Sequence, residues 1–180
     1  MLENLAAKGI KQQGHPDIRT LKMLHPEVLY GWGLVEVKRG QSGLWMATDT
    51  CPSSIISGYR DYQADPAVKN SPHNWGAAVD VLALDLDSRD SKNWPALLEE
   101  QIRIVRLAVI TTGIFNRGGL YPTQNTCHVD VCDNRWMAQY GGTKFWVKWP
   151  FDAKQYTGFT TLDVAADFAK NKIYTHARRN

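Results

Sequence analysis

The strongest hydrophobic pattern in the chain is helical and covers residues 94–112. Pro95 suits the first position of a helix, and Gly113 suits a C-terminal cap. Apolar residues recur along this stretch as one broad face, made of Leu97, Leu98, Ile102, Val105, Leu107, Ala108 and Val109. We therefore predict a long helix whose apolar face packs across a sheet.

Weaker helical patterns lie near both ends of the chain. Apolar residues from Ile18 to Val28 recur near helical spacing after a possible N-cap at Asp17. Pro26 is expected to interrupt this pattern and to start a further helical segment. A third helix is predicted over residues 161–172.

Short apolar or alternating stretches between these helices predict strands. They are residues 44–48, 53–57, 76–86 and 127–131. Residues 76–86 are apolar on both faces, which is typical of a central strand. The glycine-rich residues 113–121 are expected to contain a turn.

Alternation over residues 127–131 separates the side chains onto two faces. His128 and Asp130 share one face, and Cys127, Val129 and Val131 share the other. Because Cys127 and His128 point to opposite faces, they cannot form the nucleophile and base of a cysteine peptidase.

Composition is that of an ordinary globular protein, with 180 residues, 43% hydrophobic content and a formal net charge of +3. We expect one domain at residues 1–140 and a C-terminal extension at residues 141–180, where aromatic residues cluster. The helix of this extension is expected to pack back on the domain rather than form a separate binding module. No basic helix or finger spacing suggests nucleic-acid binding.

The chain shows no pattern that would direct it into or across a membrane. No apolar run approaches the roughly 20 residues that span a bilayer. The N-terminal residues lack the basic-then-apolar order of a signal peptide, so we expect synthesis in a cytoplasm and delivery by another route. The three cysteines, Cys51, Cys127 and Cys132, are expected to be reduced and mostly buried.

The residues with the clearest chemistry are His73 and Asp80, seven positions apart, and His128 downstream. A carboxylate inside an apolar strand is costly unless it is paired or binds a metal ion, which singles out Asp80. A single histidine on a strand is more often structural, but His128 lies beside Asp130 in a chain that also offers His73. Two histidines and one aspartate, with one position left for water, are the ligands of a catalytic zinc site.

Other polar residues admit two interpretations. Arg60 follows a predicted strand, from which it could bind a carboxylate or an oxyanion, or it could pair with a neighbouring aspartate at the surface. His15 and His25 precede prolines and are expected in loops or helix caps. The acidic loop at residues 85–90 lacks the glycine and the distal glutamate of a calcium loop.

These residues also form a known series of motifs. Ser57-Gly-Tyr-Arg60 and Gln63 precede Ser71-x-His73-x-x-Gly-x-Ala-x-Asp80, and His128-Val-Asp130 follows. Gly118-Gly-Leu-Tyr-Pro122 precedes this last motif, and Arg135-Trp136 comes after it. The series resembles the zinc D-Ala-D-Ala carboxypeptidase and L-alanyl-D-glutamate endopeptidase family of murein peptidases, over roughly residues 20–137. Many relatives are phage-encoded endolysins or virion-attached wall hydrolases.

The resemblance implies a function, a fold and a set of site residues. His73, Asp80 and His128 would bind Zn²⁺, and Arg60, Gln63 and Ser71 would bind substrate, with Arg60 also polarising the scissile carbonyl. The implied fold is α+β, with a small, mostly antiparallel sheet, flanking helices and an open zinc cleft, as in DD-carboxypeptidases and Hedgehog-like domains. The implied partner is bacterial peptidoglycan, and residues 141–180 could contact virion proteins.

The chain departs from the family at the general base. Relatives often place an acidic residue three positions before the last histidine, or a histidine two positions before it, and this chain has Asn125 and Thr126 there. Asp130 is a substitute candidate for the catalytic base, or a carboxylate that orients His128. The sequence therefore leaves two hypotheses: a zinc peptidase of the bacterial wall, and a virion structural or wall-binding protein with little or no catalysis.

Overall fold

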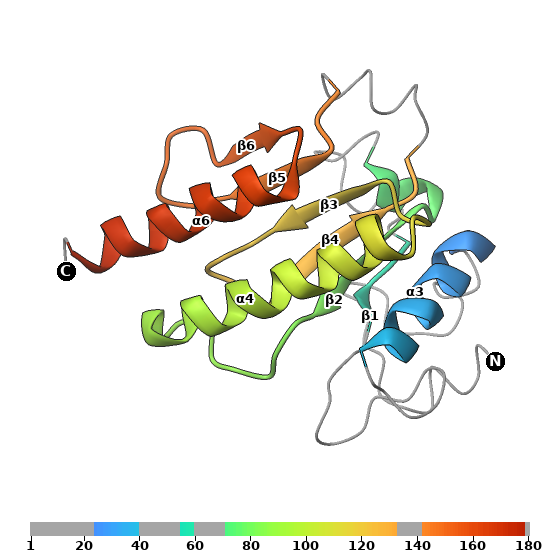
Figure 1. Cartoon of the computed structure of the whole chain (residues 1–180), viewed down its shortest axis with the longest axis horizontal. Coiled ribbons are helices and arrows are strands. Elements are labelled where there is room, and N and C mark those ends of the chain that lie inside the picture. Colours follow the sequence, from blue (N-terminus) through green and yellow to red (C-terminus); the bar gives the residue numbers. More distant parts are fainter. Residues whose placement is uncertain (1–23, 40–54, 60–70, 133–141, 179–180) are drawn as a thin grey trace.

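The computed structural model describes residues 24–39, 55–59, 71–132 and 142–178, which form a mixed sheet with helices packed on one face (Figure 1). The helical elements are α3 (Pro26–Lys38), η2 (Pro72–Trp75), η3 (Ser91–Asn93), α4 (Trp94–Val105), η4 (Arg106–Thr111) and α6 (Leu162–Ala177). The strands are β1 (Ile55–Ser57), β2 (Ala78–Leu82), β3 (Arg117–Leu120), β4 (Thr126–Asp130), β5 (Phe145–Lys148) and β6 (Tyr156–Phe159).

The sheet has six strands in the order β1-β2-β4-β3-β5-β6. Neighbouring strands are antiparallel except β3 and β5, which run parallel. The α+β class and the flanking helices are confirmed, but the expected small, mostly antiparallel sheet is corrected to a larger mixed one. The reason is that the chain crosses over after β4 and adds β5 alongside β3, a pairing that a tight hairpin cannot make.

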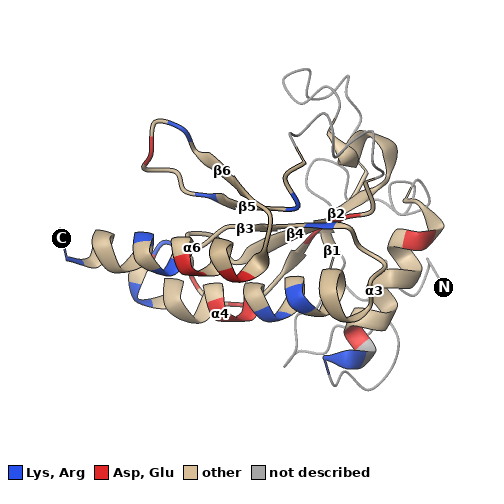
Figure 2. Cartoon of the chain, turned by 45° about the horizontal axis from the view of Figure 1, so that its top comes forward, with Lys and Arg blue, Asp and Glu red and all other residues tan. Residues whose placement is uncertain are grey.

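One face of the sheet packs against the helices and forms the core. Figure 2 shows α4 and α6 together on this side. The buried side chains that face them include Val79, Val81, Leu120, Cys127, Val129, Phe145 and Val147. Helix α4 approaches β3 so closely that a Cβ at Gly118 would lie 2.4 Å from Val105 Cγ1. Glycine is therefore required at this crossing point.

The other face of the sheet is polar, because side chains alternate along each strand. Strand register places Asp80 opposite His128, His128 opposite Gly119, and Gly119 beside Trp146. These residues form one row across four neighbouring strands, on the face turned away from α4. The candidate site lies in this row.

The predicted elements agree with the structure where the sequence pattern is long. The helix of residues 94–112 appears as α4 and a π-helical continuation, η4; Pro95 lies in its first turn, and Gly113 has a φ of 67°. Strand β2 is internal as predicted, although shorter than residues 76–86. Strand β3, in contrast, lies where the glycine-rich pattern suggested only a turn. The predicted strand at residues 44–48 lies outside the described residues.

The ends of the described region extend this arrangement. Helix α3 begins at Pro26, where Nδ1 of His25 accepts a hydrogen bond from the Glu27 amide, so His25 acts as a cap. Strands β5 and β6 continue the sheet, and α6 lies beside α4 (Figure 1). The division at residue 140 stays a prediction. Within the described ranges, no helix combines the length and the apolar character that crossing a membrane requires.

The buried side chain of Gln101, on α4, is hydrogen-bonded to the turn between β3 and β4. Its amide nitrogen donates to the carbonyl oxygens of Tyr121, at 2.9 Å, and Gln124, at 2.7 Å. Its amide oxygen accepts from the Tyr121 N–H at 2.7 Å. Helix α4 thereby determines where β4, and with it His128, enters the sheet.

We predict that Gln101→Leu lowers the free energy of unfolding by about 2–4 kcal/mol, because it leaves three backbone groups of the turn without their side-chain partner. Urea denaturation followed by circular dichroism measures this. Gln155→Leu, at an exposed position of the β5–β6 connection, is the matched control and should change stability by less than about 0.5 kcal/mol. Equal stability of the two variants would contradict the prediction.

Candidate metal centre

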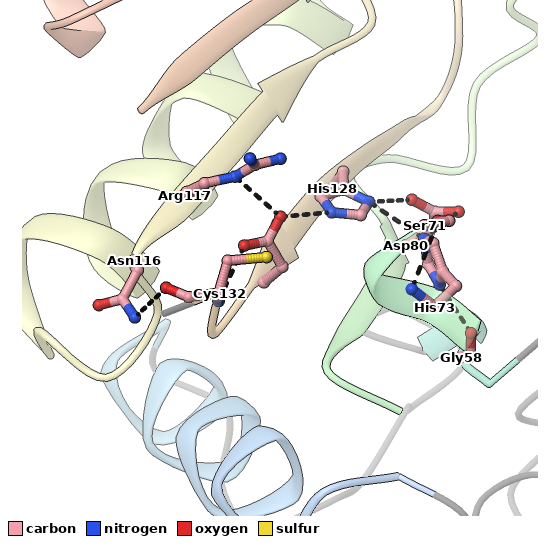
Figure 3. A network of polar contacts seen from close by, with 9 residues as sticks. Gly58, Ser71, His73, Asp80, Asn116, Arg117, His128 and Cys132 are labelled. Carbon is pink, nitrogen blue, oxygen red and sulfur yellow. Dashed lines mark hydrogen bonds and ion pairs between the residues drawn. The ribbon is translucent and has the colours of Figure 1, made fainter. Parts of the chain in front are cut away.

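His73, Asp80 and His128 come together on the polar face of the sheet, from η2, β2 and β4 (Figure 3). All three are buried, and their ligand atoms lie within 4.8 Å of one another. His73 Nε2 lies 3.1 Å from His128 Nδ1 and 3.4 Å from Asp80 Oδ2, and His128 Nδ1 lies 3.0 Å from Asp80 Oδ1. The ligand atoms of a tetrahedral zinc site are separated by about 3.3 Å, so this group could hold a metal ion.

A capped helical turn positions His73. Ser71 is its N-cap: the Ser71 hydroxyl oxygen accepts from the His73 amide, and the Asn74 side chain accepts from the Ser71 amide. Gly76 ends the turn with a φ of 65°, a conformation that suits glycine. The turn from η2 into β2 thus explains the glycine at position 76, four residues before Asp80.

Strand register positions the other two ligands. Asp80 and His128 are directly opposite each other in the antiparallel pair β2–β4, so their side chains emerge side by side on one face. Val79, Val81, Cys127 and Val129 point to the helix side and are fully buried. The same alternation that builds the core therefore presents the two ligands together.

In each imidazole, the ring nitrogen that faces away from Asp80 (the remote nitrogen) makes a hydrogen bond. Nδ1–H of His73 donates to the Gly58 carbonyl oxygen at 2.6 Å, and Nε2–H of His128 donates to Asp130 Oδ2 at 3.1 Å. These contacts turn His73 Nε2 and His128 Nδ1 toward Asp80, and each of these nitrogens carries a lone pair when its ring is neutral. Fixing the tautomer in this way is typical of metal-binding histidines.

Asp130 is completely buried and uses both carboxylate oxygens. Oδ1 accepts from the Cys132 amide at 3.1 Å, and Oδ2 accepts from His128 and from Arg117 Nε at 3.3 Å (Figure 3). The predicted common face of His128 and Asp130 is thereby confirmed. Its contacts favour the orienting role for Asp130 over the general-base role.

Two residues beside the metal centre were not singled out from the sequence. Arg117, on β3, is buried and pairs with Asp130. Trp146, on β5, has its ring centroid 5.0 Å from that of His128 and 4.9 Å from the Arg117 guanidinium carbon. An arginine before two glycines and a tryptophan 29 positions later gave no local signal, because only the β3–β5 pairing brings them together.

The electrostatics of the centre favour charged groups despite burial. Burial raises the pKa of Asp80, but the charges and hydrogen bonds of His73 and His128 outweigh it and hold that pKa well below its usual range. Burial lowers the pKa of His128, but the carboxylates of Asp130 and Asp80 outweigh it and raise the pKa above its ordinary value. The pKa of Asp130 is lowered: burial opposes this, but His128 and Arg117 prevail.

The remaining predicted residues have different outcomes. Arg60 and Gln63 lie outside the described residues, as does Cys51. Ser71 caps η2 beside His73, and its proposed contact with substrate stays a prediction. Cys127 and Cys132 are buried free thiols, and burial raises the pKa of Cys127, which disfavours a nucleophilic thiolate.

Comparisons of the chain with models of protein families, with curated proteins and with solved structures find no match.

We predict that metal affinity rises with pH and levels off above the raised pKa of His128, because protons and the metal ion compete for its Nδ1 lone pair. Asp130→Asn removes a carboxylate that raises this pKa, so the curve should move to lower pH. The affinity at its plateau should also fall about 10–100-fold, because His128 loses its orienting partner. Chelator competition at a series of pH values measures both effects.

The matched control is Asp85→Asn, an exposed carboxylate outside the centre, which should reproduce the wild-type curve. A metal affinity that is independent of pH, or unchanged in Asp130→Asn, would contradict the proposed geometry.

Proposed function

We propose that this protein is a zinc-dependent peptidase that hydrolyses a peptide bond in the stem peptides or cross-links of bacterial peptidoglycan, encoded by a phage as an endolysin or a virion-associated wall hydrolase. The observation that carries the proposal is the convergence of His73 Nε2, His128 Nδ1 and the Asp80 carboxylate, with both remote imidazole nitrogens already bound. The motif resemblance to murein peptidases supports the choice of substrate.

The donor set fits a catalytic rather than a closed structural zinc ion, because three protein ligands leave one position for water or substrate. Zinc supplies a bound water with a pKa near 7, and hence hydroxide at neutral pH. The role of the chain is to hold this chemistry in place. Asp130 keeps the His128 ring in one tautomer, and Arg117 keeps Asp130 in position as an anion.

The resemblance to murein peptidases assigns substrate binding to Arg60, Gln63 and Ser71. Arg60 would bind a substrate carboxylate or polarise the scissile carbonyl.

A second candidate is a virion structural or wall-binding protein that keeps the metal site with little catalysis. The observation that favours it is the environment of Asp130, whose buried oxygens are both occupied by neighbouring donors. Asn125, at the position where relatives carry an acid, cannot take a proton from water. Both functions use the same metal centre and differ in turnover.

We predict that His73→Ala lowers zinc occupancy and reduces wall hydrolysis by at least about a hundredfold, because it removes one of three ligands. Zinc content by mass spectrometry and release of fragments from purified peptidoglycan measure the two effects. His25→Ala is the matched control, since His25 is an exposed helix-capping histidine, and it should behave as wild type.

Mass analysis of the released fragments would also identify the bond that is cut. Full hydrolysis of peptidoglycan by a zinc-free protein would exclude the zinc-dependent peptidase. Zinc binding and co-purification with phage particles, without digestion of peptidoglycan, would support the second candidate instead.

A further inference from the structure

Strand β5 contacts the candidate metal centre through Trp146, whose ring lies against His128. Trp146 is the parallel-strand partner of Gly119, which itself lies opposite His128. A Cβ at Gly119 would lie 2.5 Å from the Trp146 ring, so the indole lies over this glycine. The Trp146 ring therefore extends from β5 across β3 to His128 on the polar face of the sheet.

Lys148 lies two residues further along β5 and emerges on the same face as Trp146. Its ammonium group lies 5.8 Å from the centroid of the Tyr121 ring and 5.7 Å from that of Tyr156. Tyr156 is its cross-strand partner on β6. Within the described part of the chain, Lys148 makes these cation–π contacts and no ion pair. Two tyrosine rings thus lie beside the positive charge of Lys148 on the polar face without neutralising it.

We propose that Lys148 is a specificity-determining residue, which binds a carboxylate of the peptide substrate on the surface that Trp146 joins to the metal centre. This inference rests on the proposed peptidase function and extends it, because it makes residues 145–156 part of the substrate site.

The distance between Lys148 and the candidate metal centre indicates how far the bound carboxylate lies from the bond that is cut. Lys148 is two strands from His128 and two residues along, which separates their Cα atoms by roughly 12 Å at the usual spacings of a sheet. An extended peptide covers roughly this length in three to four residues. The bound carboxylate is therefore several residues from the bond at the metal centre. Stem peptides meet this requirement for a bond at their D-alanine end, because a D-glutamate linked through its γ-carboxyl keeps a free α-carboxylate inside the chain.

The test uses zinc-loaded, full-length protein and two synthetic probes. One is the stem peptide L-Ala-γ-D-Glu-L-Lys-D-Ala-D-Ala, and the other is the same peptide with the glutamate α-carboxylate converted to an amide. The affinity for each is measured as KM where the peptide is cleaved, and as Kd by calorimetry where it is not. We expect the wild type to prefer the carboxylate peptide. Lys148→Gln should weaken binding of that peptide about three- to tenfold and leave the amide peptide unchanged.

Two control variants separate charge from structure. Lys148→Arg keeps the positive charge and should retain most of the preference for the carboxylate peptide. Lys154→Gln removes an exposed lysine from the β5–β6 connection and should leave both affinities unchanged. A Lys148→Gln variant that loses the preference at unchanged kcat identifies a binding role.

The outcomes for this inference and for the proposed function are distinct. A wild type that cleaves peptidoglycan but shows the same carboxylate preference in Lys148→Gln refutes the Lys148 subsite and leaves the peptidase standing. A wild type that binds the carboxylate peptide through Lys148 but cleaves neither this peptide nor purified peptidoglycan supports the subsite and refutes the peptidase. Failure to bind either peptide refutes the subsite.

Discussion

The structure depends on one constraint at its centre: two buried imidazoles must each turn one ring nitrogen toward the same carboxylate. The Gly58 carbonyl and the Asp130 carboxylate satisfy this constraint from opposite sides, by binding the remote nitrogens of His73 and His128. Without these acceptors each ring could rotate or change tautomer, and a buried polar nitrogen would be left unpaired at a cost of about 1–3 kcal/mol. The metal-binding geometry and the stability of the polar face therefore have the same origin.

The three residues of the candidate metal centre could be singled out from the sequence because local patterns mark them. Asp80 stands out as a carboxylate in an apolar strand, and the alternation of residues 127–131 places His128 and Asp130 on one face. The helix of residues 94–112 was predictable for the same reason, since its apolar period is long and its ends carry Pro95 and Gly113. All these signals can be recognised from neighbouring positions in the sequence, without knowing which distant segments pair.

The parts of the site that could not be predicted depend on pairings between distant segments. Arg117, Trp146 and Gln101 acquire their roles only when β3 lies between β4 and β5 and when α4 crosses beneath the turn at Tyr121. A glycine-rich strand such as β3 gives little periodic signal, because glycine adds no side chain to either face. Two glycines that look like turn residues prove to be contact points: Gly118 receives α4, and Gly119 receives the Trp146 ring.

The parallel pairing of β3 with β5 joins the segment after residue 140 to the part of the sheet that carries the candidate metal centre. Adding β5 to the sheet covers Arg117 with the Trp146 ring, and a cation–π contact in so buried a position strengthens the charge pair between Arg117 and Asp130. The pair in turn keeps Asp130 ionised and the pKa of His128 high. A segment that composition alone sets apart from the domain thus contributes to the electrostatics of the candidate ligand His128, as well as to the surface beside it. An aromatic residue at position 146 is accordingly constrained by three contacts: with Gly119, with the Arg117 guanidinium over its ring, and with the His128 ring.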